Sequence, residues 1–514
     1  MKININKKIS LKKGLLVIPV FTPAEGRDYQ KKSQPGGTPY PTAVKNFLAA
    51  AIKHDKFKAG FGDTVVTHLY NRNLPRRLLV IGVGKKANFK ASKARVIGAK
   101  ISKTARQLKV DLMSVMLLPE LENCMEEFVE GLILAQYDLG KFKTKKKNKN
   151  ELERVELVTA TQPKAGLTKN VREANTFSSE ELKKSVNKAE IICESVSFTK
   201  DLVNSPSNIV DGEYMTKEAE KLAKENKYKI IILNKKDLEK MGWGGLLAVN
   251  QGSAKDPKCI VLEYSGAQDS KEKPVVLIGK GVMFDTGGYN LKPINHIETM
   301  HQDMAGAAAV LGLFGVLRKL NIKKNVIGIM PIVENLVGSK AYRPSDIIKM
   351  LSGQTVEITN TDAEGRLILA DAITYGKRFN PECMITIATL TGAVMIALGD
   401  RYAGIMGNNA KLRMALTKAG KEVDELVWPL PIHADYKKKM NSSVADMTNC
   451  DLPTSRMAGS SKGGAFLDRF FGKNKWCHID IGGTGFINDP QEYQTKGATA
   501  YGVRLFTRLL ENLQ

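Results

Sequence analysis

The sequence predicts an α/β protein of two domains, a smaller one at the N-terminus and a larger one at the C-terminus. The chain has 514 residues, which is too many for one ordinary core. Short apolar, β-branched segments alternate with segments that are apolar at helical spacing, as in α/β folds. A long helical segment separates two such series. We therefore expect an N-terminal domain over residues 1–170, a linking helix over 171–200 and a second domain over 201–514.

The first domain contains four segments of strand character and three of helical character. Its lysine-rich stretch "KFKTKKKNKNELE" (141–153) has little hydrophobicity, which favours an exposed loop. The predicted strands cover 14–21, 64–69, 76–84 and 154–160, and the predicted helices cover 40–53, 93–108 and 122–137.

The linking helix is predicted from "SSEELKKSVNKAEIICESVSFTKDLVN" (178–204), because serines at its start can cap the free backbone N–H groups of the first turn. A second alternating series follows. Its predicted strands cover 229–234, 259–266, 274–281, 325–333, 355–359, 383–390 and 477–483.

Composition narrows the class of protein. Hydrophobic residues make up 43% and charged residues 25%, as in ordinary globular proteins. The longest apolar run (385–398) is shorter than the roughly 18–20 residues of a membrane span, so we expect no membrane segment. The N-terminal run "GLLVIPVF" lacks a convincing cleavage site after it and is better interpreted as a strand than as part of a signal peptide.

Cysteines and histidines predict a cytoplasmic protein without an imidazole-built metal site. The six cysteines are scattered and form no C-x-x-C pair, so neither a disulfide framework nor a zinc-finger spacing is present. The six histidines form no H-E-x-x-H pattern.

Positive charge is concentrated in one part of the chain. The net charge is +25, of which residues 1–200 carry +19 and residues 201–514 carry +6. A basic surface of this kind could attract nucleic acid. We favour the simpler interpretation of a solvated lysine-rich surface, and keep a DNA-binding architectural role as the alternative.

Three loops carry the residues that could do chemistry. "PVVLIGKGVMFDTGGYNLKP" (274–293) places Lys280, Asp285 and Lys292 in a glycine-rich stretch after a buried strand. "ETMHQDMAGAAAVLGLFGVL" (298–317) places Asp303 at the start of a helix, and "NTDAEGRL" (360–367) brings Asp362, Glu364 and Arg366 together, with the helix "LILADAI" following. Each loop alone has a structural explanation, as a turn, a helix cap or a residue that complements the helix dipole.

Taken together, the three loops predict a metal site. Loops at the ends of strands are where open α/β sheets bind their ligands. Carboxylates without cysteine or clustered histidine suit Zn²⁺, Mn²⁺ or Mg²⁺. Four carboxylates would overcharge a single ion, whereas two ions that share bridging carboxylates would balance the charge. This indicates a hydrolytic site with two metal ions.

The chain resembles the leucyl aminopeptidase family of cytosolic two-metal aminopeptidases. The resemblance rests on "NTDAEGRL" and on the segments "GKGVMFDTGGYNLKP", "MHQDMAGAAA", "KDLVNSPSN", "WCHIDIGGTG" and "TKGATAYGVRLFTRLL". It covers residues 195–514, in order and at family-like spacing. It implies a larger C-terminal α/β/α catalytic domain with a mixed central sheet.

The resemblance also implies a role for each candidate residue. Asp285 and Glu364 would bridge both metals. Lys280 and Asp303 would complete the more tightly held metal site, and Asp362 the more exchangeable one. Lys292 would be the electrophile beside the scissile carbonyl, and Arg366 would hold a bicarbonate that acts as general base.

The implied substrates are peptides with a free N-terminus. Met300, Thr389 and Gly392 lie where the family lines its substrate cleft, and an apolar pocket would favour leucine-like side chains. The implied assembly is a homohexamer. A dipeptidase that prefers Cys-Gly is the enzymatic alternative. The segment "DLPTSRMAGSS" (451–461) departs from the family's glycine-rich version.

Overall fold

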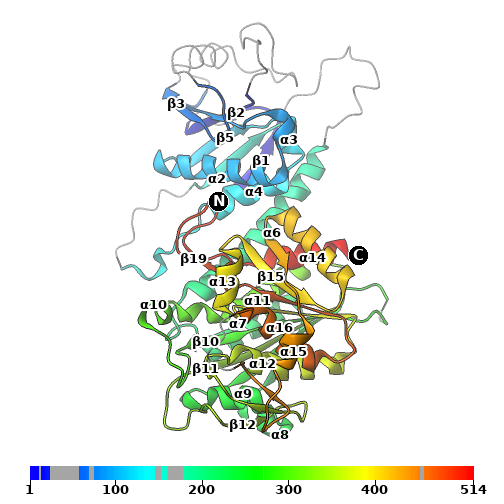
Figure 1. Cartoon of the computed structure of the whole chain (residues 1–514). Helices are drawn as coiled ribbons and strands as arrows, with labels where there is room; N and C mark the ends of the chain where they lie inside the picture. The colour runs from blue at the N-terminus through cyan, green and yellow to red at the C-terminus, as the bar shows by residue number, and fades with distance from the viewer. Residues whose placement is uncertain are drawn as a thin grey trace. The chain divides into compact units, whose positions relative to one another are not determined.

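The computed structural model describes residues 1–10, 13–22, 57–68, 74–144, 152–159, 177–269, 271–451 and 457–513 (Figure 1). The chain divides into two compact units. The N-terminal unit comprises Met1–Cys193 and Pro490–Thr495, and the C-terminal unit comprises Glu194–Asp489 and Lys496–Gln514. The border between them falls inside the long helix α6 (Ser179–Asn204). Residues 160–176, where we expected the first boundary, lie outside the described residues.

The N-terminal unit is built on a six-stranded sheet of order β1-β6-β5-β2-β4-β3. All neighbouring strands are parallel except β3 and β4. The four strands predicted here are β2, β3, β4 and β6, whereas β1 and β5 were not anticipated. The strands are β1 (Lys2–Asn6), β2 (Leu15–Val20), β3 (Thr64–His68), β4 (Arg77–Gly82), β5 (Leu112–Met116) and β6 (Arg154–Val158).

Helices cover one face of this sheet. Apolar side chains of the strands pack there against α2, α4 and the first turns of α6. The predicted helices over 93–108 and 122–137 correspond to α2 (Ala91–Gln107) and to α3 (Pro119–Glu122) with α4 (Met125–Leu134), and two short 3₁₀ helices are η1 (Lys86–Asn88) and η2 (Gly140–Phe142). The predicted helix over 40–53 and residues 145–151 of the lysine-rich stretch lie outside the described residues.

Helix α6 begins as its serines predicted. The Ser178 hydroxyl accepts a hydrogen bond from the backbone N–H of Glu181 (3.1 Å), and the Glu181 carboxylate accepts one from the backbone N–H of Ser178 (2.7 Å). This reciprocal pair is a capping box, which satisfies two donors that the helix itself cannot pair.

The C-terminal unit has a mixed nine-stranded sheet. Its order is β16-β15-β18-β14-β9-β11-β8-β7, with β10 paired to β11. The strands are β7 (Lys229–Leu233), β8 (Lys258–Tyr264), β9 (Val275–Gly279), β10 (Gly281–Asp285), β11 (Val326–Asn335), β14 (Cys383–Ala388), β15 (Tyr402–Gly407), β16 (Leu426–Pro429) and β18 (Trp476–Asp480). Five of these strands pair with one another in parallel, so their carboxyl ends meet at one edge of the sheet. They are β9, β10, β11, β14 and β18.

Small sheets complete this unit. Strands β12 (Ile347–Lys349), β13 (Thr355–Glu357) and β17 (Met447–Thr448) form one, and β19 (Phe486–Ile487) with β20 (Gly497–Ala498) form another. The strand predicted over 355–359 is therefore β13, outside the central sheet. The other predicted strands of this region are β7, β8, β9, β11, β14 and β18.

Helices cover both faces of the central sheet, which gives three α/β/α layers. Alternate residues of β9 show this, because Val275 and Leu277 belong to one apolar cluster while Val276 and Ile278 belong to the other. The first cluster includes α7 (Gly212–Asn226), α11 (Ala305–Leu317), α14 (Ala410–Val423) and α17 (Val503–Asn512). The second includes α8 (Lys235–Met241), α9 (Gly244–Val249), α12 (Gly365–Gly376) and α16 (Gly459–Phe471).

Short helices connect these layers. They are η3 (Asn250–Gly252), α10 (Ile294–Ile297), η4 (Met300–Met304), η5 (Lys377–Phe379), α13 (Gly392–Leu398) and α15 (Ala434–Lys438). Among the described residues, one helical stretch, Met300–Leu317, is long and apolar enough to cross a membrane, but 83% of it is buried inside the molecule. It has the burial of a core helix.

Candidate metal centre

The candidate residues gather where the parallel strands of the C-terminal unit end. Lys280 directly follows β9 and Asp285 is the last residue of β10. Asp303 lies in η4 just before α11, and Glu364 is the residue that precedes α12. The first part of the expected glycine-rich loop is instead strand β10, because residues 281–285 pair with β11, and the loop follows over 286–293.

Two glycines after β10 allow the loops to approach one another. Gly287 and Gly288 have φ angles of 83° and 63°, in the left-handed region that side chains disfavour. A Cβ atom on Gly287 would lie 2.9 Å from an Asp362 oxygen, and one on Gly288 would lie 2.9 Å from the Thr361 hydroxyl. Both conformation and space therefore require glycine beside the "NTDAEG" loop.

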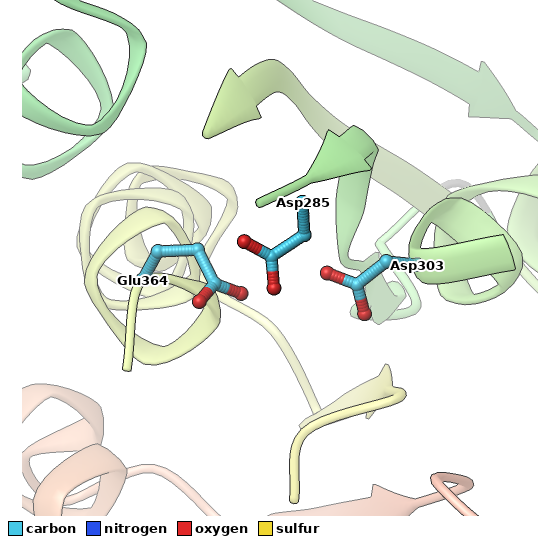
Figure 2. A group of neighbouring side chains, drawn as sticks. All are labelled: Asp285, Asp303 and Glu364. Atoms are coloured by element: carbon cyan, nitrogen blue, oxygen red, sulfur yellow. The ribbon is translucent and has the colours of Figure 1, made fainter. Parts of the chain in front are cut away.

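Three carboxylates converge at this edge. Asp285, Asp303 and Glu364 each offer an oxygen, and these three atoms lie within 4.8 Å of one another. Figure 2 shows the three side chains pointing toward a shared space from separate elements. All three residues are buried.

Lys280 bridges two of these carboxylates. Its Nζ lies 2.8 Å from Asp303 Oδ2 and 2.7 Å from Glu364 Oε1. Its third hydrogen bond is donated to the backbone carbonyl of Thr389 (3.0 Å). Lys280 is itself buried, so its contacts lie within the cluster rather than in solvent.

Lys292 joins the fourth carboxylate to the group. Its Nζ lies 2.8 Å from Asp285 Oδ2 and 2.5 Å from Asp362 Oδ1. The side chain of Asp362 is 33% exposed, so this part of the cluster faces solvent. Four carboxylates and two lysine ammonium groups leave two negative charges uncompensated when all six groups are ionised.

The crowding shifts the proton affinities of these groups. Burial raises the pKa of Asp303 to about 8 and the pKa of Asp362 to about 7, although lysine ammonium groups act against it. Burial and the neighbouring Glu364 also raise the pKa of Asp285. Burial acts on Glu364 in the same direction, but Lys280 and Lys292 lower its pKa on balance. Raised pKa values in a group of carboxylates indicate that too few positive charges lie near them to balance their negative charge.

The two lysines are held as ammonium groups in this arrangement. Burial lowers the pKa of each, but the carboxylates around them outweigh it and raise the pKa above its ordinary value. Asp303 and Glu364 are the main contributors for Lys280, and Asp285 and Glu364 for Lys292.

The donor set fits divalent cations. Oε2 of Glu364 is buried and has no hydrogen-bond partner within the described part of the chain. A buried carboxylate oxygen without a partner costs free energy unless a cation or a donor satisfies it. Oxygen ligands with one amine nitrogen suit Zn²⁺, Mn²⁺ and Mg²⁺ better than softer metals.

Arg366 lies in the first turn of α12 and offers a site for an anion. Its Nη1 donates to the backbone carbonyl of Asn449 (2.8 Å), whereas its buried Nε has no hydrogen-bond partner among the described residues. A guanidinium with a free donor in a buried position can receive a planar oxyanion. No ion pair of the described residues joins Arg366 to the carboxylate cluster.

The three expected substrate residues lie in different environments. Thr389 follows β14, and its hydroxyl donates to Asp303 Oδ1 (2.6 Å), so it contacts the carboxylate cluster. Met300 is half-buried in η4, and Gly392 is the exposed first residue of α13. Residues 452–456 of the divergent segment lie outside the described residues.

One buried polar residue of the site escaped the sequence analysis. Asn335 ends β11, and its Nδ2 donates to Asp285 Oδ1 (2.7 Å) and to the backbone carbonyl of Thr361 (3.1 Å). It thus ties two of the loops together. The pairing of Asp285 with Asn335 across β10 and β11 creates this contact, and nothing in either segment alone announces it.

Comparison with known families gives two matches. The model described as "Cytosol aminopeptidase family, catalytic domain" matches residues 197–507. The model described as "Cytosol aminopeptidase family, N-terminal domain" matches residues 17–146, which the sequence analysis had related to the family only by length and α/β character.

Curated relatives extend over nearly the whole chain. A "Probable cytosol aminopeptidase" of Geobacter sp. (strain M21) is 35% identical over 497 residues, covering 96% of each chain. One of Syntrophotalea carbinolica is 39% identical and covers 91% of this chain and 92% of its own. One of Rickettsia bellii is 37% identical and covers 84% of each.

A solved structure shares the fold. The structure titled "Bottromycin maturation enzyme BotP in complex with Mn" aligns with a TM-score of 0.80 at 24% identity, covering 97% of this chain and 99% of that one. At this level of identity the likeness concerns the fold alone.

Proposed function

The chain belongs to the cytosol aminopeptidase family and is an aminopeptidase, and we propose that it releases leucine-like N-terminal residues from peptides at a site with two divalent cations. The observation that carries this proposal is the convergence of Asp285, Asp303 and Glu364 to within 4.8 Å of one another. The end of β10, η4 and the start of α12 supply these carboxylates, so their meeting is a property of the fold.

Asp285 and Glu364 are proposed to bridge the two cations. Asp303 and Lys280 would complete one cation's ligands, for which the Lys280 ammonium would have to lose a proton and become a neutral amine, and Asp362 would complete the other's. Two observations support this assignment: Oε2 of Glu364 has no hydrogen-bond partner among the described residues, and the pKa values of Asp285, Asp303 and Asp362 are raised. When bound, Zn²⁺ or Mn²⁺ would supply Lewis acidity toward water and the scissile carbonyl, and a bicarbonate would supply a general base. Mg²⁺ fits the same donors.

Lys292 is proposed to stabilise negative charge that develops on the substrate carbonyl. Its raised pKa keeps the side chain protonated near neutral pH. A preorganised ammonium in a water-poor site stabilises developing charge more strongly than the same group in water. Its two carboxylate partners orient it.

Arg366 is proposed to hold the bicarbonate. The support is its buried Nε, which has no partner among the described residues, together with the bond that fixes its Nη1 to Asn449. This arrangement orients the guanidinium while leaving one donor for the anion. It also accounts for the absence of a histidine from the described carboxylate cluster.

Met300, Thr389 and Gly392 are proposed to line the cleft for the N-terminal side chain of the peptide. The contact between Thr389 and Asp303 supports this position for Thr389. A homohexamer and a cytoplasmic location complete the proposal, the latter in keeping with the word "cytosol" in the relatives' names.

Metal analysis combined with a substrate panel tests the proposal. We expect close to two divalent ions per chain and hydrolysis of leucine amide that a chelator abolishes and added Mn²⁺ or Zn²⁺ restores. N-acetyl-leucine amide should not be hydrolysed. Full activity after complete metal removal would contradict the proposal, and Cys-Gly as the single good substrate would favour the dipeptidase alternative.

A further inference from the structure

One residue of the loop between β14 and α13 forms hydrogen bonds with two of the proposed metal ligands. The backbone carbonyl of Thr389 accepts a hydrogen bond from Lys280 Nζ (3.0 Å), and the Thr389 hydroxyl donates to Asp303 Oδ1 (2.6 Å). A displacement of Thr389 would therefore move or release both ligands at once. The contacts that fix this loop therefore help to determine the positions of Lys280 and Asp303.

Asp480 holds the loop from the neighbouring strand. It is the last residue of β18 and pairs with Ala388, the last residue of β14. Its Oδ1 accepts hydrogen bonds from the backbone N–H groups of Leu390 (3.1 Å) and Thr391 (3.3 Å).

The other oxygen of Asp480 completes this hold. Its Oδ2 accepts a hydrogen bond from the Thr391 hydroxyl (2.6 Å), and Oδ1 also accepts one from the N–H of Gly482 (3.2 Å). The Thr391 hydroxyl in turn caps α13 by accepting from Val394 N–H (3.2 Å). One carboxylate thus fixes the backbone on both sides of residue 390 and the start of the following helix.

The environment of Asp480 shows that this function needs a carboxylate. The side chain is fully buried, and no ion pair of the described residues includes it. Burying an isolated carboxylate is expensive, so its bonds to N–H and hydroxyl donors must compensate for the lost water. A neutral residue of the same size cannot accept hydrogen bonds at both oxygens.

We propose that Asp480 is a positioning residue of the metal centre, which acts through the Thr389–Thr391 loop to set the places of Lys280 and Asp303. The inference rests on the proposed function, because it concerns the residues proposed there as metal ligands. No hydrogen bond or ion pair of the described residues joins Asp480 to the carboxylate cluster. Residues that orient metal ligands typically change metal affinity or activity by 10- to 100-fold when they are replaced.

The test measures metal affinity by competition with a chelator, on full-length protein, for Asp480→Asn, Asp480→Ala and the wild type. Asn keeps one acceptor and turns the other into a donor, so we expect roughly tenfold weaker binding of Mn²⁺ or Zn²⁺. Ala removes all four bonds, and we expect a loss near 100-fold. If the Ala variant does not fold, the Asn variant decides alone.

The matched control is Asp371→Asn. Asp371 on α12 is also fully buried and accepts backbone N–H bonds, from Leu246 and Leu351 (2.9 Å each), but it holds no residue of the carboxylate cluster. We expect this variant to lose stability while its metal affinity and its kcat for leucine amide stay within about twofold of the wild type. A purely structural role of Asp480 would give the same pattern at position 480.

A double-mutant cycle tests whether Asp480 acts through Thr389. Thr389→Val removes the bond to Asp303, and Thr389→Ser keeps the hydroxyl and should retain wild-type affinity. The double variant Asp480→Asn with Thr389→Val should lose less metal-binding free energy than the two single variants lose together, because both changes act on the same contact.

Two results would overturn the inference: an Asp480→Asn protein with wild-type metal affinity, or additive effects in the cycle. Either leaves the proposed function untouched, provided that the wild type binds metal and hydrolyses leucine amide. A wild type that binds no metal would instead overturn the proposed function.

Discussion

Both units of this chain bury charged side chains, but a buried pair in the N-terminal unit is balanced differently from the carboxylate cluster of the C-terminal unit. In the N-terminal unit, Arg95 on α2 and Glu130 on α4 form a fully buried pair, with Nε and Oε2 2.7 Å apart and each side chain 1% exposed. In the C-terminal unit, two lysines face four carboxylates. The first arrangement is matched in charge, and the second has a surplus of negative charge.

A second buried carboxylate of the N-terminal unit is also paired with donors from the protein. Glu156 on β6 is fully buried, and it accepts hydrogen bonds from Ser10 and Ser114 and pairs with Arg154 at 3.0 Å. Its oxygens are occupied by donors from the protein. The C-terminal unit instead leaves Oε2 of Glu364 without a partner among the described residues.

The difference separates charges that stabilise a fold from charges that await a ligand. A matched buried pair satisfies itself, and removing one member harms stability. A surplus of buried carboxylates raises their pKa values and is relieved by cations. Each prediction below tests this distinction.

The largest effect is expected from Glu364→Gln. Loss of a proposed bridging carboxylate should lower kcat/KM for leucine amide by at least about 10³-fold, which corresponds to about 4 kcal/mol of transition-state stabilisation. Metal content should fall as well. Glu130→Gln is the control in the other unit, and its folded fraction should keep activity within about twofold. If kcat/KM for leucine amide in Glu364→Gln stayed within tenfold of the wild type, the distinction between the two kinds of buried charge would be wrong.

The next prediction concerns the stability of the N-terminal unit. Glu130→Gln removes the carboxylate charge that lies 2.7 Å from the buried Arg95, and it should destabilise the N-terminal unit by about 3–5 kcal/mol. Hydrogen exchange of backbone amides in α2 and α4 measures this. The double change Arg95→Met with Glu130→Leu should recover most of the loss, because it removes both charges of this pair. A loss below about 1 kcal/mol for the single variant would contradict a matched pair.

Metal removal should act on one unit alone. At a free metal concentration of 100 times Kd, bound metal stabilises the folded state by about 2.7 kcal/mol. Chelation should therefore increase hydrogen exchange in β10 and α12 and leave α2 and α4 unchanged. Equal changes in both units would show that the surplus charge of the C-terminal unit is not where the metal acts.

The last prediction concerns pH. Because the pKa values of Asp303 and Asp362 are raised to about 8 and about 7, these groups hold protons that a metal must displace near neutral pH. Metal affinity should therefore fall as the pH is lowered from 8 to 6, by roughly tenfold per unit for each displaced proton. Asp362→Asn should make this dependence shallower, and a pH-independent affinity in the wild type would contradict the pKa shifts.

Local sequence patterns predicted much of the C-terminal unit. The strands around β9, β11 and β14 are uninterrupted apolar runs, which are typical of strands buried on both faces. The candidate ligands could be selected because charged residues at the ends of such runs are costly without a ligand. Strand β10 was missed because its five residues follow β9 after Lys280 alone and looked like a loop.

Other contacts could not be predicted from local patterns. Asn335 reaches Asp285 because β11 pairs with β10, and Asp480 reaches Thr391 because β18 pairs with β14. Arg95 and Glu130 meet because two amphipathic helices pack on one sheet. In each case, the partners lie far apart in the chain, and neither segment identifies the other.

The sequence by itself therefore determined many of the strands and helices, and which charged residues stand at their ends, because burial periodicity and the cost of isolated charge act over a few neighbouring positions. The tertiary structure decided the order of the strands, and with it which carboxylates share a cation-sized space and which are occupied by the backbone. Strand order depends on how all the apolar faces pack at once, and that balance is spread over the whole chain.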